Sequence, residues 1–199
     1  MRTLIRILSA VSLAFVFFSL VSAAAPSQDY YAKVNIWYED PAKILGTNYH
    51  KGAIIPFGAK ITITSQIKEK IYFTVADQPG ITFILTNIPK HTMVGAAELS
   101  KLYFTTADPK AKGTEFDKFN AKEKKNIEDG TIEAGMSKEA VIASYGYPPK
   151  HRTPSLTSNF WTYWDSRYVR KQVTFQNNLI INIEEITESL DGPRIYYVP

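Results

Sequence analysis

No cysteine occurs among the 199 residues of this chain. Its absence excludes disulfides, thiolate metal sites and cysteine nucleophiles, and it excludes a lipid anchor attached through a cysteine thioether. Histidine is scarce as well, with His50, His91 and His151 as the only three. No pair of them has the helical spacing of metal ligands, and no carboxylate is spaced to complete a triad, so we interpret them as surface histidines. We therefore expect no metal, no other cofactor and no enzymatic activity.

Long hydrophobic runs are absent except near the N-terminus, where 15 uncharged residues extend from Ile7 to Val21. The run follows Arg2 and Arg6 and precedes small residues, an order typical of an export signal. This pattern predicts a signal peptide at residues 1–23 that is cleaved after Ala23. An uncleaved membrane anchor is the alternative, but spanning a bilayer takes roughly 20 apolar residues. We expect a periplasmic or secreted protein without a transmembrane segment after cleavage.

An excess of one charge sign is also missing. The formal charge of +4 falls to +2 when the two arginines of the predicted signal peptide are removed, because 21 basic and 19 acidic residues remain. So small a charge gives no reason to expect a nucleic-acid partner. Hydrophobic residues make up 45% of the chain, which is enough for an ordinary core without disulfides.

Residues 28–108 are rich in β-branched and aromatic side chains. Ile61 and Ile63 alternate with threonines, which is typical of a strand with one buried face. A turn is expected at residues 77–80 and a short helix over 95–103. Predicted strands cover residues 31–38, 60–65, 71–75 and 81–85. Short strands between turns favour a small antiparallel β-barrel or sandwich.

Residues 113–187 have a different pattern, which begins in a lysine-rich stretch. Thr114 is the expected N-cap of a first helix that ends at Gly130, and Ser137 is the expected N-cap of a second. Gly146 is predicted to take the left-handed C′ position of the second helix. Strands are predicted at 160–164, 172–175 and 179–183, with a tight hairpin turn at residues 177–178. The fold class is therefore α+β, with an acidic tail at 188–199.

The second helix and its flanks, residues 135–148, carry a Gly-Met-Ser start and a Gly-x-Pro end. This run resembles the signature of the SmpA/OmlA family, which includes the BamE subunit of the outer-membrane β-barrel assembly machine. The resemblance extends through the strands and implies an ααβββ domain over residues 113–187. Members of that family are usually lipid-anchored, whereas this chain lacks the anchoring cysteine. Residues 33–64 more faintly resemble a bacterial SH3 domain, which implies binding to cell-wall peptides.

The best candidate binding site is the aromatic strand at residues 160–164 and the basic residues after it. Trp161 and Tyr163 lie on one face of the strand, while Trp164 lies on the other. One face has to cover the helices, and the other is then open to a partner unless the first domain covers it. Aromatic side chains beside cations are typical of protein interfaces. The basic residues are Arg167, Arg170 and Lys171.

A second candidate is the proline-stiffened loop at residues 147–154. Its Lys150 and Arg152 could meet an anionic partner, although such a loop is more often a rigid connector. The leading functional hypothesis is a binding or assembly factor that contacts an envelope protein. The alternatives are a module that binds the cell wall or anionic lipid, and an enzyme that acts on envelope polymers.

Overall fold

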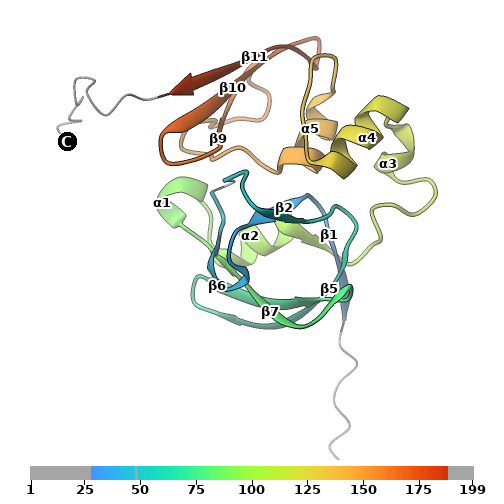
Figure 1. The fold of residues 1–199 in the computed structure, drawn as a ribbon, viewed down its shortest axis with the longest axis vertical. Helices are drawn as coiled ribbons and strands as arrows, with labels where there is room; N and C mark the ends of the chain where they lie inside the picture. The colour runs from blue at the N-terminus through green and yellow to red at the C-terminus, as the bar shows by residue number, and fades with distance from the viewer. Residues whose placement is uncertain (1–27, 48, 188–199) are drawn as a thin grey trace, which may run out of the picture.

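A computed structural model describes residues 28–47 and 49–187. The predicted signal peptide and the tail at 188–199 lie outside the described residues. The chain has a mixed α+β fold with a strongly curled sheet. It forms two halves stacked on each other, a β-rich half up to residue 105 and a later half with most of the helices (Figure 1). Within the described residues no helix is long and apolar enough to cross a membrane.

The first half is built on a six-stranded sheet in the order β3-β7-β6-β5-β1-β8. All of its neighbours are antiparallel except β3 and β7. The sheet curls into a half-barrel that β2 and β4 complete as a separate pair (Figure 1). The strands are β1 (Asp29–Ala32), β2 (Ile36–Tyr38), β3 (Ile44–Leu45), β4 (Ala53–Ile55), β5 (Lys60–Ile67), β6 (Lys70–Val75), β7 (Gln78–Thr86) and β8 (Phe104–Thr105).

The single strand predicted at residues 31–38 is wrong, because the chain breaks there into β1 and β2. Asn35 lies in the break and is only 3% exposed. Its side chain accepts a hydrogen bond from the Phe57 amide at 2.6 Å and donates one to the Ile127 carbonyl at 2.7 Å. The buried amide thereby replaces the ladder bonds that a continuous strand would make.

The other predicted strands of this half are confirmed as β5, β6 and β7. The predicted turn at 77–80 is displaced, because β7 already begins at Gln78 and Val75 pairs with Gln78. The predicted short helix is confirmed as α2 (Ala96–Tyr103), with Gly95 at its N-cap. Two further short helical segments, η1 (Pro41–Lys43) and α1 (Pro89–Thr92), lie in the connections.

The first predicted helix of the second half is divided into α3 (Glu115–Lys118) and α4 (Ala121–Asp129). Thr114 is the N-cap residue of α3, as predicted, although its side chain makes no capping bond. Asn120 caps α4 through a reciprocal capping box, in which its side chain bonds the Glu123 amide and Glu123 bonds the Asn120 amide. Gly130 ends α4 in the left-handed region, as predicted.

Helix α5 (Lys138–Tyr145) begins after Ser137, whose hydroxyl accepts a hydrogen bond from the Ala140 amide, as its predicted N-cap role requires. Gly146 does follow the helix, but its φ of 75° and ψ of −171° are not left-handed helical, which corrects that prediction. Such a positive φ is open to glycine because it lacks a Cβ atom.

The chain ends in a three-stranded antiparallel sheet of β9 (Phe160–Trp164), β10 (Val169–Gln176) and β11 (Leu179–Thr187). The predicted hairpin turn is confirmed, because Asn177 and Asn178 have φ of 50° and 67°. Helices α4 and α5 pack on one face of this sheet, and the core between them and the sheet includes Val141, Trp161 and Phe175. A separate core fills the curled sheet, and Ile142 packs against both.

Candidate functional site

Trp161 and Tyr163 are core residues, because both are 0% exposed. The Trp161 ring lies 4.7 Å from that of Phe175, and the Tyr163 hydroxyl donates a hydrogen bond to the Gly146 carbonyl at 3.0 Å. This face of β9 covers the helices. The expectation that these two residues contact a partner is therefore corrected, since neither reaches the surface.

Trp164 points to the other face and is half-buried against the first half of the chain. Its ring is edge-on to the rings of His91 and His151, each at a centroid distance of 5.0 Å. It also stacks at 6.1 Å on Tyr49. The first half therefore covers this face of β9 at Trp164. At the other end of the strand Phe160 is 57% exposed.

The basic residues after β9 have different surroundings. Arg167 is exposed and lies over the Tyr168 ring, whereas Arg170 is half-buried in β10. Lys171 is engaged inside the molecule, because its ammonium lies 3.0 Å from the Asp165 carboxylate and donates to the Tyr145 hydroxyl at 3.0 Å. It is therefore not available to a partner in this arrangement.

This internal pair lies within the second half, and His50 of the first half meets it at Asp165, at 3.3 Å. Burial by itself would raise the pKa of Asp165, but the neighbouring His50 and Lys171 side chains lower it below its ordinary 3.8. Burial would lower the pKa of Lys171, and Tyr145 and Asp165 raise it above its ordinary 10.5. The stabilisation from the pair is lost only below the ordinary aspartate range or above the ordinary lysine range.

The interpretation of the histidines as surface residues is wrong for His50. Its side chain is 3% exposed, stacks at 3.9 Å on the Tyr145 ring and lies 3.3 Å from Asp165. Its Nε2 donates to the Tyr145 carbonyl at 3.0 Å, because a carbonyl only accepts. His50 therefore joins the two halves rather than meeting solvent.

His91 and His151 come from opposite halves and stack at 4.8 Å. The His151 amide donates to the His91 carbonyl at 3.2 Å, and the His151 Nδ1 lies 3.1 Å from the same oxygen. Burial lowers the pKa of His91, and the nearby charges of His151, Lys90 and Arg152 lower it further. All three histidines thus lie along the contact between the halves, which we call the seam.

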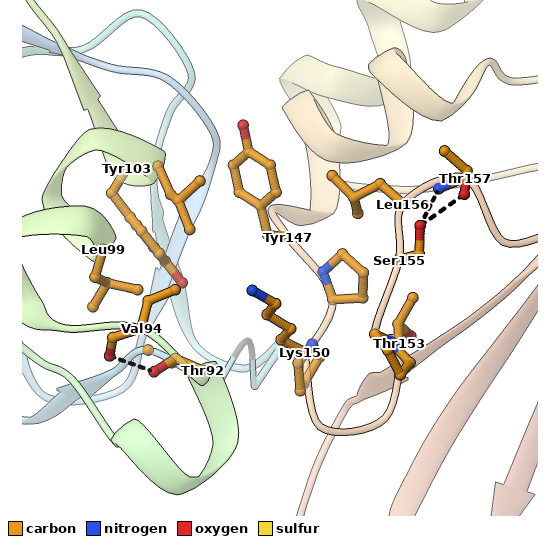
Figure 2. Close-up of a pocket in the computed structure, with 15 residues that line it drawn as sticks. Thr92, Val94, Leu99, Tyr103, Tyr147, Lys150, Thr153, Ser155, Leu156 and Thr157 are labelled. Atoms are coloured by element: carbon orange, nitrogen blue, oxygen red, sulfur yellow. Dashed lines mark hydrogen bonds between the residues drawn. The ribbon is translucent and has the colours of Figure 1, made fainter.

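A cavity of about 460 Å³ opens at the seam beside this histidine pair. Figure 2 shows α2 and the chain after α1 on one side, with the loop after α5 on the other. Tyr103 and Tyr147 face each other across it, and burial keeps the Tyr103 phenol neutral by raising its pKa. The apolar part of the wall consists of Val94, Leu99, Leu102, Tyr103, Tyr147, Pro148, Pro149 and Leu156.

The serine and threonine hydroxyls in the wall have partners within the protein. Thr92 donates to the Asn87 side chain at 2.7 Å, and Thr153 accepts from the Thr162 amide at 3.0 Å. The Ser155 and Thr157 hydroxyls bond each other at 2.7 Å. These engaged groups shape the cavity, so its open surface is mainly apolar.

The structure separates the two predicted basic residues of the proline loop. Lys150 lines the cavity and extends across its opening toward Tyr103 and Tyr147 (Figure 2). Arg152 is exposed and lies near His91. Within the described part of the chain, neither side chain forms a hydrogen bond or an ion pair, which distinguishes them from Lys171.

The described residues contain no cluster of three or more histidine or acidic residues that could hold a metal ion. The chain matches no protein-family model, no curated protein and no solved structure.

Sequence reasoning missed the cavity wall contributed by α2. Leu99 and Leu102 have the spacing of an ordinary buried helix face, and nothing in their pattern distinguishes a cavity from a closed core. The available signal was the loop from Tyr147 to Pro149, whose two prolines hold the chain away from α5.

Proposed function

We propose that the protein is a non-enzymatic binding protein of the cell envelope, periplasmic or secreted, and that it holds a small apolar molecule in the seam cavity. The cavity carries this proposal, because about 460 Å³ is within the range of roughly 300–1,000 Å³ found for small-molecule sites. Its position between two packed halves is also where such sites commonly occur. The export signal expected at residues 1–23 supports a location outside the cytoplasm.

The chemistry of the cavity supports binding rather than catalysis. Among the described residues that line it, none is a carboxylate or a histidine, and its serine and threonine hydroxyls are engaged within the protein. General acid–base chemistry needs a titratable group placed against the reacting atoms. Lys150 is the one cationic group in the lining, and its place at the opening suits recognition of a ligand.

A neutral fluorophore tests the proposal directly. N-phenyl-1-naphthylamine should bind the purified protein at a single site with increased emission, and Leu156→Gln should weaken this binding. Leu156 lines the cavity and is 40% exposed, so the polar substitution leaves the core intact. The matched control is Ile186→Gln in β11, where the isoleucine is 41% exposed and lies outside the cavity. Equal binding by both variants and the parent would refute a ligand in this cavity.

A second candidate is contact with an envelope protein through the outer face of the last sheet. Phe160 and Ile186 are 57% and 41% exposed, and both lie on the face opposite Trp161. The order α4, α5, β9, β10, β11 supports the resemblance to the SmpA/OmlA family, and we propose an ααβββ domain of that kind over residues 113–187. Scattered exposed apolar residues are ordinary, but two on one sheet face suit an interface.

The same two variants separate the candidates. Photo-crosslinking in living cells from a probe at Phe160 should capture one defined envelope protein if the sheet face is the interface. Ile186→Gln should then reduce capture, and Leu156→Gln should not. Sedimentation with purified peptidoglycan, without protein capture, would instead favour the cell-wall alternative.

A further inference from the structure

We propose that the ligand of the seam cavity is a single-tailed anionic amphiphile, with its tail in the cavity and its head group bound by Lys150 and Arg152. This inference rests on the proposed function and names the chemistry of the ligand. It follows from basic residues in the two segments that line the cavity with Thr92, Lys150 and Thr153, and we call these residues the basic cluster: Lys90, His91, Lys150, His151 and Arg152. Of the five, Lys150 lines the cavity itself.

The basic cluster is assembled from two segments far apart in the sequence. Lys90 and His91 belong to α1, whereas the other three residues belong to the loop after α5. The main-chain hydrogen bond from His151 to His91, at 3.2 Å, fixes one segment against the other. Folding thus brings together charges that repel each other.

No acidic side chain of the described residues neutralises this charge. Lys90, Lys150 and Arg152 take part in none of the ion pairs that the described chain forms. The carboxylate nearest in sequence to Trp164 is that of Asp165, and it is paired with Lys171. Unpaired cations held together at a cavity mouth favour an anionic ligand, because each gains a charge-assisted hydrogen bond.

The shape of the cavity restricts the rest of the ligand. Its wall is largely apolar, and its volume of about 460 Å³ suits one small tail. Lys150 places its apolar stem along the wall and its ammonium at the opening (Figure 2). A ligand with its anionic head group at the Lys150 ammonium and its tail against Leu99 and Tyr147 would contact both the cation and the apolar wall.

A set of probes with one tail and three head groups tests the inference by calorimetry below their micelle concentrations. Decanesulfonate should bind at least about tenfold more tightly than decanol, the ratio that a hydrogen bond to a charged group supplies. Decyltrimethylammonium should bind more weakly than decanol. Lys150→Gln should reduce the affinity for decanesulfonate toward that for decanol, with the remaining preference due to Arg152, and leave decanol unchanged. Lys112→Gln, at an exposed lysine outside the cavity, should change neither.

The outcomes distinguish this inference from the proposed function. Equal affinities for decanesulfonate and decanol, or a full preference retained in Lys150→Gln, would refute the anionic head group while leaving the cavity ligand in place. Sodium sulfate that binds as tightly as decanesulfonate would place the anion site apart from the cavity and would also refute it. If none of the three tailed probes binds, both the cavity ligand and its head group are refuted.

Discussion

Replacement of Asn35 by alanine tests how the two halves are joined. The Asn35 side chain bonds the Phe57 amide at 2.6 Å and the Ile127 carbonyl at 2.7 Å, and its own amide donates to the Ala143 carbonyl at 2.9 Å. One buried residue between β1 and β2 is thus tied to both α4 and α5. Alanine keeps the main-chain bond and removes the other two.

The cost can be worked out from what each partner loses. The buried Phe57 amide is left without an acceptor, which costs about 2 kcal/mol. The Ile127 carbonyl still accepts from the Gly130 amide at 3.3 Å, so its loss is about 1 kcal/mol. We expect Asn35→Ala to lower the free energy of unfolding by about 3 kcal/mol in total.

Urea unfolding followed by tryptophan fluorescence and circular dichroism measures this loss, provided that the slope with denaturant is unchanged. Asn182→Ala is the matched control, because that exposed side chain donates only to Glu184 at 2.9 Å. The control should stay within about 0.5 kcal/mol of the parent. A loss below about 1 kcal/mol for Asn35→Ala would contradict the role we assign to its buried bonds.

Three further predictions concern single residues. Burial would raise the pKa of Glu123, but hydrogen bonds from Ser137 and Asn120 lower it below its ordinary 4.5. The stabilisation that the Glu123 carboxylate gives the fold is therefore lost as pH falls below 4.5. The melting temperature of Glu123→Gln should decrease less steeply in acid than that of the parent. Asn178→Val should destabilise the protein by about 1–2 kcal/mol in urea unfolding, because φ is 67° there, whereas Asn178→Gly should be nearly neutral. Because the pKa of His91 is lowered below its ordinary 6.5, the free energy of unfolding without ligand should decrease as pH falls below about 6.5. Over the same pH range the affinity for decanesulfonate should increase. A decrease in that affinity, measured by calorimetry, would contradict this prediction.

Local signals predicted much of the second half. The Ser137 hydroxyl, Gly130 and the Asn177-Asn178 pair each act within a few residues of their own position, so a sequence pattern is sufficient to recognise them. The start of α4 shows the limit of such signals. The pattern predicts one helix that starts after Thr114, whereas the capping box that starts α4 at Asn120 uses Glu123, which also accepts from the distant Ser137.

Contacts between the halves were beyond the reach of local patterns. Residues 31–38 have the composition of one strand, and the break at Asn35 depends on partners 22 and 92 residues away. Alternation did place Trp161 and Trp164 on opposite faces of β9. It could not show that Trp164 would meet His91 and His151, because those histidines come from two segments far apart in the sequence, α1 and the loop after α5.

The two flanks of the seam differ in how they are held. At Asn35 and His50 the halves are joined by buried hydrogen bonds to Ile127 and Tyr145, and His50 also meets the Asp165 carboxylate that pairs with Lys171. At the basic cluster they are joined by one main-chain bond and stacked rings, under mutual repulsion of unpaired cations. An anionic ligand bound there would relieve that repulsion and contact both halves at once. Its binding should therefore stabilise the folded chain by an amount that rises with the logarithm of ligand concentration above the dissociation constant, and this gain should be reduced in Lys150→Gln.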